Sequence, residues 1–269
     1  MASTVAFLGA GKMGEALISG LLRSGYDADD VVFVERYDDR AAYVAEQYGI
    51  ARHDVAGALG RADTLLVAVK PAETTALLDE VSTLGAAGKL VISIVAGLSC
   101  ATLEQHLPAG TALVRVMPNT PALVNEAMSA VAPGTNAGEE HLARAEALLA
   151  TVGKVIRVDE DHLDAVTAVS GSGPAYFFYV VESMVAAGVA LGLDKDVAQD
   201  LAIQTVTGAA AMMRDSGDDP TTLRENVTSP NGTTAAAIRT FDEMGIRQAI
   251  AAGMQACRDR SRELAVELT

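Results

Sequence analysis

Short runs of apolar, mostly β-branched residues alternate with helical stretches along the first part of the chain. The apolar runs predict strands at Val5–Leu8, Val31–Glu35, Thr64–Val69, Val91–Val95 and Leu113–Met117. Because these runs are continuous, the strands are expected to be parallel and covered on both faces. The stretches between them predict helices at Gly14–Arg23, Arg40–Tyr48 and Thr74–Leu84. Such a series predicts an α/β fold with a doubly wound sheet, to which Met128–Ala132 and Val155–Val158 would add edge strands around a helix at Glu139–Thr151.

The pattern changes after residue 158, and no further strand is expected. Helical spacing predicts helices at Leu163–Ala168, Ala175–Leu191, Lys195–Arg214, Thr234–Met244 and Ile246–Glu267. The domain boundary is therefore predicted between an α/β domain over residues 1–158 and an all-helical domain over residues 159–269. Several of these helices are apolar on more than one face, which favours a dimer or larger oligomer.

One segment, Pro174–Leu193, is nearly all apolar and has the length of a membrane span. Glu182 lies near its middle, where a charge facing lipid is unfavourable, and no basic cluster flanks it. We therefore expect a buried helix, in the core or at a subunit interface, rather than a membrane helix.

Composition narrows the partners and the compartment. The net charge of −15 disfavours nucleic acid and anionic membrane surfaces. The two cysteines, Cys100 and Cys257, lie far apart and in no metal-ligand spacing, so a reducing cytoplasm is the simplest expectation. The first residues lack the basic region of a signal peptide, and none is expected.

A glycine-rich motif follows the first predicted strand and opens the first helix. Gly9-Ala10-Gly11-Lys12-Met13-Gly14 matches the G-x-G-x-x-G pattern of dinucleotide-binding folds. In such motifs the first glycine permits a tight turn, the second lets the backbone approach a pyrophosphate, and the third allows close packing of helix and strand. With strand and helix both in place, the motif predicts a Rossmann-type domain rather than an ordinary glycine-rich turn.

The end of the second strand is expected to bind the adenosine ribose, roughly twenty residues after the motif. Glu35 would hydrogen-bond the ribose hydroxyls of NAD, whereas Arg36 would accept the 2′-phosphate of NADP, with Arg40 one helical turn further on. The two residues conflict, and a solvated charge pair is the alternative. The sequence leaves the preference between NADPH and NADH open.

Three further strand ends should border the cofactor, since ligands bind at the carboxyl ends of such strands. Ala68-Val69-Lys70-Pro71 would place a lysine near the ribose or nicotinamide, unless Lys70 only ends the strand. Ala96 and Gly97 are small enough for a nicotinamide to lie against the backbone. Asn119 would bind the carboxamide or the substrate, or else only shape the turn before Pro121.

Two segments combine glycine with hydroxyl side chains before a helical pattern: Val169–Tyr176 and Thr228–Thr234. Each predicts a break whose backbone amides face an anion. In the second, Asn231-Gly232 indicates a turn and Thr233 or Thr234 begins a helix, where free N–H groups and the helix dipole suit a carboxylate. The alternative is a plain N-cap after a loop. Neither segment contains a metal-ligand set, a nucleophile–base pair or paired carboxylates, which indicates chemistry carried mainly by a cofactor.

Taken together, these motifs resemble the pyrroline-5-carboxylate reductases, nearly from end to end. The resemblance rests on the glycine motif, Val69-Lys-Pro71, Met117-Pro-Asn-Thr-Pro121, Ala168–Tyr176 and Val227–Thr234. It implies NADPH- or NADH-dependent reduction of 1-pyrroline-5-carboxylate to L-proline, the last step of proline biosynthesis. It also implies a Rossmann domain, a helical domain that dimerises and binds substrate, and rings of dimers in some members.

The resemblance also implies residue roles. Ser229, Gly232 and Thr233 would hold the substrate carboxylate, and Thr234, the one catalytic residue expected, would hydrogen-bond the ring nitrogen. The family usually has a second glycine where this chain has Asn231, which tolerates a left-handed backbone better than most residues. A glutamate that some members place near the substrate falls at Gly217 here, so that role is not assigned.

Other functions remain as alternatives. An imine reductase acting on another cyclic imine is the nearest of them. A β-hydroxyacid dehydrogenase would need a proton-accepting lysine after its glycine-rich turn, and Gly173–Tyr179 contains none. A non-catalytic dinucleotide-binding regulator would not need a carboxylate site such as Thr228–Thr234.

Overall fold

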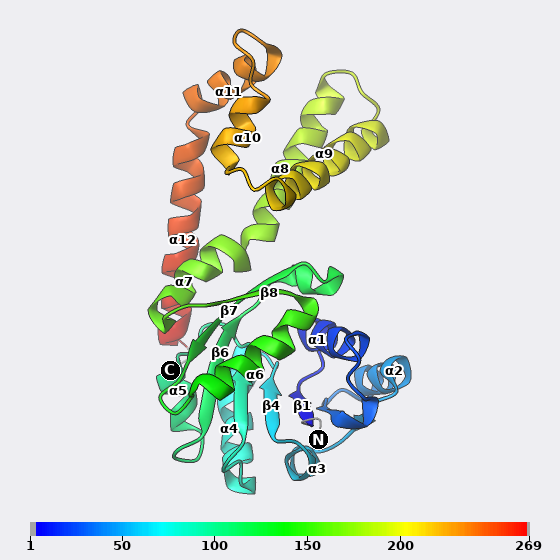
Figure 1. Cartoon of the computed structure of the whole chain (residues 1–269), viewed down its shortest axis with the longest axis vertical. Coiled ribbons are helices and arrows are strands. Elements are labelled where there is room, and N and C mark those ends of the chain that lie inside the picture. Colours follow the sequence, from blue (N-terminus) through cyan, green and yellow to red (C-terminus); the bar gives the residue numbers. More distant parts are fainter. Residues whose placement is uncertain (1–3, 268–269) are drawn as a thin grey trace. The chain divides into compact units, whose positions relative to one another are not determined.

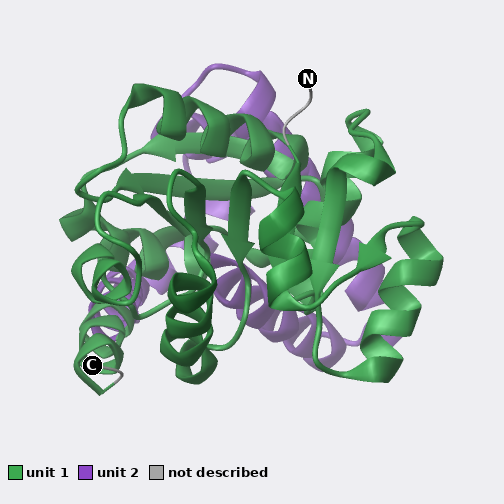
Figure 2. Ribbon diagram, turned by 90° about the horizontal axis from the view of Figure 1, so that it is seen from below, with its two compact units in different colours: residues 1–172, 257–269 green, residues 173–256 purple. Residues whose placement is uncertain are grey.

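The chain folds into two compact units, coloured separately in Figure 2. The computed structural model describes residues 4–267. The first unit holds the described residues up to Ser172 together with those from Cys257 onward, and the second holds Gly173–Ala256. Each unit is described by itself below.

An eight-stranded sheet forms the centre of the first unit (Figure 1), with the order β3-β2-β1-β4-β5-β6-β7-β8. The strands are β1 (Val5–Leu8), β2 (Val31–Val34), β3 (Ala51–Arg52), β4 (Thr64–Val67), β5 (Leu90–Ser93), β6 (Ala112–Met117), β7 (Ala127–Pro133) and β8 (Gly153–Arg157). All neighbours are parallel except β6 and β7. The order turns back on either side of β1 and β4, which confirms the predicted doubly wound sheet. Of the two predicted edge strands only β8 lies at an edge, because β7 pairs with both β6 and β8, and the other edge is β3, which was not predicted.

The two faces of this sheet are covered by different helices. Alternate residues of β1 point to opposite faces: Val5 and Phe7 join one core cluster, whereas Ala6 and Leu8 join the other. The first cluster is covered by α1 (Lys12–Arg23), α2 (Asp38–Tyr48) and α6 (Glu139–Leu149), and the second by α3 (Val55–Arg61), α4 (Pro71–Leu84) and α5 (Cys100–Gln105). All four β1 residues are buried, which explains why the strand is apolar throughout.

The sequence prediction missed short elements that depend on capping. Asp54 caps α3 by accepting a hydrogen bond from the Gly57 amide at 2.7 Å, and Ser99 caps α5 by accepting one from the Thr102 amide at 3.0 Å. Both helices are too short to show a clear hydrophobic period. Four 3₁₀ turns, Ala28–Asp30, Thr120–Val124, Ala150–Val152 and Glu160–His162, complete the connections.

The segment Val169–Ser172, predicted as a break, is helical instead. Helix α7 (Leu163–Val166) continues into a π-helix over Thr167–Gly171, where the Ser172 amide donates to the Thr167 carbonyl at 2.8 Å. A Cβ on Gly171 would lie 2.4 Å from Met117 Cε, so the glycine allows this wide turn to pack against the end of β6. The prediction that the amides of Val169–Ser172 face an anion is therefore wrong for this stretch, because the turn itself uses them.

The second unit is entirely helical in its described residues. It contains α8 (Gly173–Ala190), α9 (Lys195–Asp215), α10 (Pro220–Asn226), α11 (Thr233–Glu243) and the first part of α12 (Ile246–Glu267), which ends in the first unit. Helices α8 and α9 approach closely at small residues, since a Cβ on Gly188 would lie 3.0 Å from Ala198 Cβ. Helix α10 was missed by the prediction, although Asp219 before Pro220 is a typical helix start.

Helix α8 is not a core helix of this chain. Only Gly173 is buried along it, and Phe177, Phe178 and Tyr179 are 59–71% exposed. The sequence predicted that this helix is buried either in the core or at a subunit interface. The core location is wrong, and the subunit interface stays a prediction. Among the described residues, one helical stretch, Glu160–Ala190, is long and apolar enough to cross a membrane by length and composition alone, and it contains Glu182.

The predicted domain limits and the compact units follow different features of the chain. The sheet ends with β8 at Arg157, close to the predicted limit at residue 158. The compact unit continues through α7 and the π-helix to Ser172. The return of α12 adds Ser261, whose hydroxyl donates to Asp164 Oδ1 at 2.7 Å. The limits 1–158 and 159–269 stay a prediction.

Candidate functional site

The glycine motif forms a tight turn between β1 and α1. Gly9 has φ of +99°, and a Cβ there would lie 2.7 Å from the Ala68 carbonyl oxygen. A Cβ on Gly14 would lie 2.6 Å from the Gly9 carbonyl oxygen. These two glycines are therefore required by the turn and by the close approach of α1 to the end of β4.

The middle glycine has no such packing role. A Cβ on Gly11 would meet nothing within 4 Å, so no neighbour in the chain requires a glycine there. Gly11 is the N-cap of α1 and makes no side-chain cap, which leaves the amides of Lys12, Met13 and Gly14 without an intrahelical acceptor. Open space beside free amides at a helix N-terminus fits the pyrophosphate of a dinucleotide.

Glu35 is held by backbone amides at the end of β2. Its carboxylate accepts from the Ala10 amide at 3.2 Å and from the Tyr37 amide at 3.1 Å. The Arg52 guanidinium donates to the Glu35 carbonyl from the other side, at 2.7 and 3.1 Å. This carboxylate is thus fixed beside the glycine turn, where an adenosine ribose is expected.

The two arginines near Glu35 differ in availability. Arg40 Nε donates to the Ala10 carbonyl at 2.8 Å, and its Nη2 pairs with Glu15 at 2.5 Å. The Arg40 side chain is thus committed to fastening α2 to the glycine turn. Arg36 is 60% exposed, lies 4.6 Å from the centre of the Tyr37 ring, and pairs with Glu73 at 2.7 Å. Of the two, Arg36 is the more exposed and the better candidate for a 2′-phosphate, although Glu73 already pairs with it.

The Glu15 carboxylate accepts two hydrogen bonds from α2, one from Arg40 and one from the Tyr48 hydroxyl at 2.9 Å. Partial burial alone would raise the pKa of Glu15, but the hydrogen bonds from Arg40 and Tyr48 outweigh it and lower that pKa. The carboxylate therefore stays charged and keeps α2 bound to α1. Sequence reasoning had placed neither Glu15 nor Tyr48 in this support.

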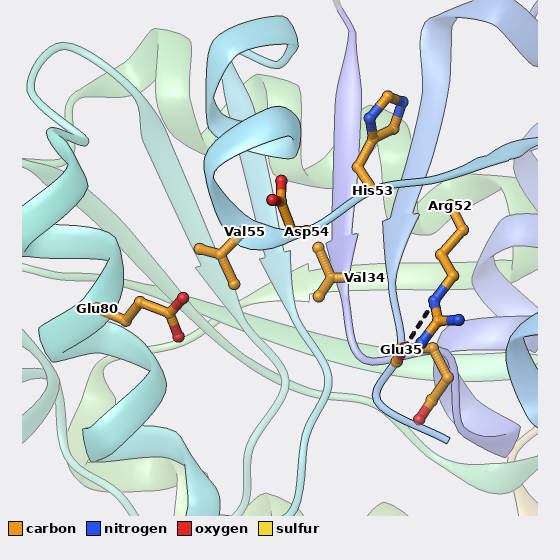
Figure 3. Close-up of a pocket in the computed structure, with 7 residues that line it drawn as sticks. All are labelled: Val34, Glu35, Arg52, His53, Asp54, Val55 and Glu80. Atoms are coloured by element: carbon orange, nitrogen blue, oxygen red, sulfur yellow. Dashed lines mark hydrogen bonds between the residues drawn. The ribbon is translucent and has the colours of Figure 1, made fainter. Parts of the chain in front are cut away.

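A pocket of about 440 Å³ opens beside the same strand end, as Figure 3 shows. Its lining residues come from the end of β2, from the segment that runs from β3 into the start of α3, and from α4: Val34, Glu35, Arg52, His53, Asp54, Val55 and Glu80. Dashed lines in the picture mark the bonds from Arg52 to Glu35. The mixture of two valines with polar groups suits the adenosine end of a dinucleotide, and Arg52 to Val55 were not predicted as site residues.

The other predicted strand ends border the same edge of the sheet. Ala68 and Val69 contact Gly9, and Lys70 is the exposed N-cap of α4 with Pro71 as the first helical residue. After β5, Ala96 is exposed and Gly97 has φ of +82°, a conformation that favours glycine. Parallel strands place these ends together, so their roles in cofactor binding remain a consistent proposal.

Asn119 is nearly buried and has two partners within the first unit. Its Nδ2 donates to the Ser170 carbonyl at 3.1 Å, and its Oδ1 accepts from the Met128 amide at 2.9 Å. The side chain joins the loop after β6 to β7 and to the π-helix. These bonds are not the expected alternative either, because the Asn119 side chain does not cap the turn that contains Pro121. We treat Asn119 as a support for the edge, since both ends of its amide have partners within the first unit.

Cys100 is a buried neutral thiol. Burial, together with the nearby Glu160 carboxylate, raises the pKa of this thiol to about 12. Its backbone amide donates to Glu160 Oε1, which also accepts from Arg115 at 2.9 Å. The residue therefore packs the start of α5 and offers no thiolate at neutral pH.

In the second unit, the Thr228–Thr234 loop ends at the start of α11. Gly232 is the N-cap, and no side chain caps the helix although hydroxyl residues surround it. The Gly232 amide donates to the Ser229 carbonyl at 3.0 Å, and a Cβ on Gly232 would lie 2.7 Å from Ser229 Oγ. Asn231 has φ of +59°, the left-handed conformation expected for it. The amides of the first turn of α11 thus remain open to an anion.

Two family models match the chain. Residues 160–264 match the model for pyrroline-5-carboxylate reductase dimerisation. Residues 4–97 match the model described as NADP oxidoreductase, coenzyme F420-dependent. The first match includes α8, the helix with the exposed apolar residues.

Individual relatives extend the similarity to nearly the whole chain. A pyrroline-5-carboxylate reductase of Corynebacterium melassecola is 44% identical over 266 residues, covering 97% of this chain and 98% of the relative. One of Mycobacterium tuberculosis (strain H37Rv) is 43% identical over 285 residues, covering 97% of each.

Among solved structures, a pyrroline-5-carboxylate reductase from Coxiella burnetii has a TM-score of 0.94 at 32% identity and covers 98% of this chain and 99% of its own. A pyrroline carboxylate reductase from Plasmodium falciparum, solved with NADP bound, has a TM-score of 0.85 at 25% identity, with 98% of each chain covered. Identity above 40% over almost the full length, with both domain models in order, shows that the chain belongs to the pyrroline-5-carboxylate reductase family.

Proposed function

We propose that this chain reduces 1-pyrroline-5-carboxylate to L-proline with its substrate on the Thr228–Thr234 loop and a nicotinamide dinucleotide on the glycine turn. The reaction is that of the family, an NAD(P)H-dependent oxidation–reduction at a carbon–nitrogen bond. The single observation that carries the assignment of the loop is the uncapped start of α11, where hydroxyl residues are abundant and none caps the helix.

The substrate is an anion at neutral pH because of its carboxylate. The free amides of Thr233 and Thr234 and the positive end of the helix dipole suit that charge. Ser229 adds a hydroxyl, and the close approach of Ser229 to Gly232 leaves no space for a side chain at Gly232. Asn231 preserves the turn through its left-handed backbone, in the place where the family usually has glycine.

Thr234 is proposed to orient the ring nitrogen of the imine. The imine nitrogen can take its proton from solvent before reduction, so the Thr234 hydroxyl needs only to accept a hydrogen bond from the iminium N–H. A bound nicotinamide supplies the hydride to the carbon of the C=N bond. Binding and orientation are then the contributions of the protein, and they require no general base.

The cofactor is proposed to be NADPH, with NADH also accepted. Gly11 and the first amides of α1 would hold the pyrophosphate, while Glu35 and Arg36 lie where the ribose of the adenosine is expected. The match to an NADP oxidoreductase model over residues 4–97 supports this choice.

Self-association is supported by the match to the dimerisation model and by the exposed apolar residues of α8. We propose a homodimer or a larger ring of dimers that works in the cytoplasm without nucleic acid or membrane partners. The net charge of −15 and the two free cysteines support that proposal.

Cofactor oxidation measured with pyrroline-5-carboxylate, using NADPH and NADH in separate reactions, tests this function. Turnover that depends on the imino acid and yields proline is the expected result. A folded protein that oxidises neither cofactor in the presence of the substrate would contradict the assignment.

A further inference from the structure

The ion pair between Arg36 and Glu73 spans the place where the adenosine is expected. Arg36 follows β2 and Glu73 lies in the first turn of α4, which follows β4. In the sheet, β1 lies between β2 and β4, and the glycine turn begins at the carboxyl end of β1. The 2.7 Å contact between Arg36 Nη2 and Glu73 Oε1 therefore joins two strand ends on either side of the dinucleotide turn.

The guanidinium of Arg36 is occupied in a way that blocks a two-point grip on phosphate. An arginine binds phosphate most strongly through two parallel N–H bonds, and Nη2 belongs to both pairs of nitrogens that can form them. Nη2 has two hydrogens, and it donates here both to Glu73 and to the Tyr37 hydroxyl. A 2′-phosphate can gain the bidentate grip only by displacing one of these partners.

Glu35 is a second carboxylate near Arg36, which it precedes in the chain. It is held by the Ala10 and Tyr37 amides, so it stays where it can accept a hydrogen bond from a free 2′-hydroxyl. A carboxylate that repels the phosphate and an arginine that attracts it thus share one site. Whether Arg36 is paired with Glu73 or free to bind phosphate therefore decides how strongly the site favours a 2′-phosphate over a 2′-hydroxyl.

We propose that Glu73 is a specificity-determining residue, a built-in competitor for Arg36 that weakens binding of the cofactor's 2′-phosphate and so narrows the preference for NADPH over NADH. Glu73 acts through Arg36 and leaves the rest of the adenosine site unchanged. The inference rests on the proposed placement of the dinucleotide.

Two mononucleotides isolate the 2′-phosphate without any turnover: adenosine 2′,5′-bisphosphate and 5′-AMP, which differ only in that group. Titration calorimetry with the full-length protein gives their dissociation constants. Glu73→Gln should tighten binding of the bisphosphate about two- to five-fold, the range of an exposed ion pair, and leave 5′-AMP unchanged. Asp79→Asn is the matched control, because Asp79 lies on the same helix, is exposed and carries the same charge.

A double-mutant cycle identifies the route. Arg36→Gln should weaken binding of the bisphosphate and leave binding of 5′-AMP unchanged. Adding Glu73→Gln to that variant should then have no further effect on either affinity. A general change in charge would instead act equally in both backgrounds and would appear in the Asp79→Asn control. Either of those results overturns the proposal, as does weaker bisphosphate binding by Glu73→Gln, which would make Glu73 a support for Arg36.

Reduction of pyrroline-5-carboxylate by the wild-type protein, measured in parallel, separates this inference from the proposed function. Turnover combined with an unchanged bisphosphate affinity in Glu73→Gln would reject the role of Glu73 and leave the reaction standing. Failure of the wild-type protein to bind either mononucleotide would reject both the role of Glu73 and the placement of the adenosine site. The steady-state ratio of kcat/KM for NADPH and NADH should shift toward NADPH in Glu73→Gln.

Discussion

The two compact units place their apolar residues in opposite ways. In the first unit, β1, β4 and β5 are buried along their whole length between two layers of helices. In the second unit, α8 has one buried residue and α11 has none. The first unit therefore covers its own core, whereas the second exposes an apolar surface that another surface must cover.

Their polar groups differ in the same sense. At the carboxyl edge of the sheet, Glu35, Arg40 and Asn119 all have hydrogen-bond partners within the unit. The Thr228–Thr234 loop provides no side-chain cap for the start of α11. On the proposed placement of the ligands, the first unit binds the cofactor with groups that already have partners, and the second binds the substrate with backbone amides that have none within the helix.

The largest effect is expected from Gly14→Ala in the first unit. Its Cβ would lie 2.6 Å from the Gly9 carbonyl oxygen, so α1 must move and stability should fall by about 2–3 kcal/mol with loss of cofactor binding. Gly11→Ala is the matched variant, since its Cβ meets nothing within 4 Å. Gly11→Ala should change thermal stability little and still weaken binding of the cofactor. Equal melting temperatures for the two variants would contradict the packing difference.

Thr234→Ala should slow the reduction of the substrate, which is proposed to bind the second unit, and should not affect cofactor binding at the sheet edge of the first unit. We expect kcat/KM for pyrroline-5-carboxylate to fall about a hundred-fold, as for loss of one oriented hydrogen-bonding group, with cofactor affinity unchanged. Thr234→Ser should recover most of the activity. Thr240→Ala, in the same helix with its hydroxyl bonded to the Ala236 carbonyl, serves as the control. An unaltered kcat/KM would remove Thr234 from the mechanism.

Phe178→Asp tests whether the exposed surface of α8 is covered by a second copy. Phe178 is 70% exposed, so the change should leave the monomer folded and weaken self-association by about thirty-fold or more. Leu123→Asp, at a residue 53% exposed in the first unit, is the control. Analytical ultracentrifugation over a range of concentrations measures both. Equal association constants would show that α8 is not the contact.

Asn231→Gly should have the smallest effect. Both residues accept the φ of +59° found there, so stability and KM should change by less than about 0.5 kcal/mol in free-energy terms. Asn231→Ala should cost about 1 kcal/mol and raise KM, because alanine resists the left-handed conformation. A large loss in Asn231→Gly would give the Asn231 side chain a role of its own.

The prediction from sequence succeeded where local pattern and burial agree. The five strands predicted between Val5 and Met117 were found within about two residues of their ends, since strands buried on both faces are apolar throughout. The exposed two-residue strand β3 was missed. The glycine motif and the start of α11 were also found, because Gly9 and the Asn231–Gly232 turn need backbone conformations that few residues adopt.

The prediction failed where long-range contacts decide. The π-helix at Thr167–Gly171 depends on Gly171 packing against Met117, and the break predicted from its glycine and serine residues did not form. The sequence offered both Arg36 and Arg40 as candidates for binding the 2′-phosphate. Only the fold shows that the Arg40 side chain is hydrogen-bonded to Ala10 and Glu15. Glu73 gave no signal, since its partner lies far away in sequence.

The sequence by itself determined the main strands and the longer helices, the sites of the tight turns and the family, because these depend on side-chain size, periodicity and backbone freedom at single positions. Only the tertiary structure decided which partners the polar groups have, since Arg36, Glu35 and Asn119 acquire theirs when strand ends and turns meet. It also decided that α8 lies on the surface of this chain, because hydropathy alone does not distinguish a core helix from an interface helix.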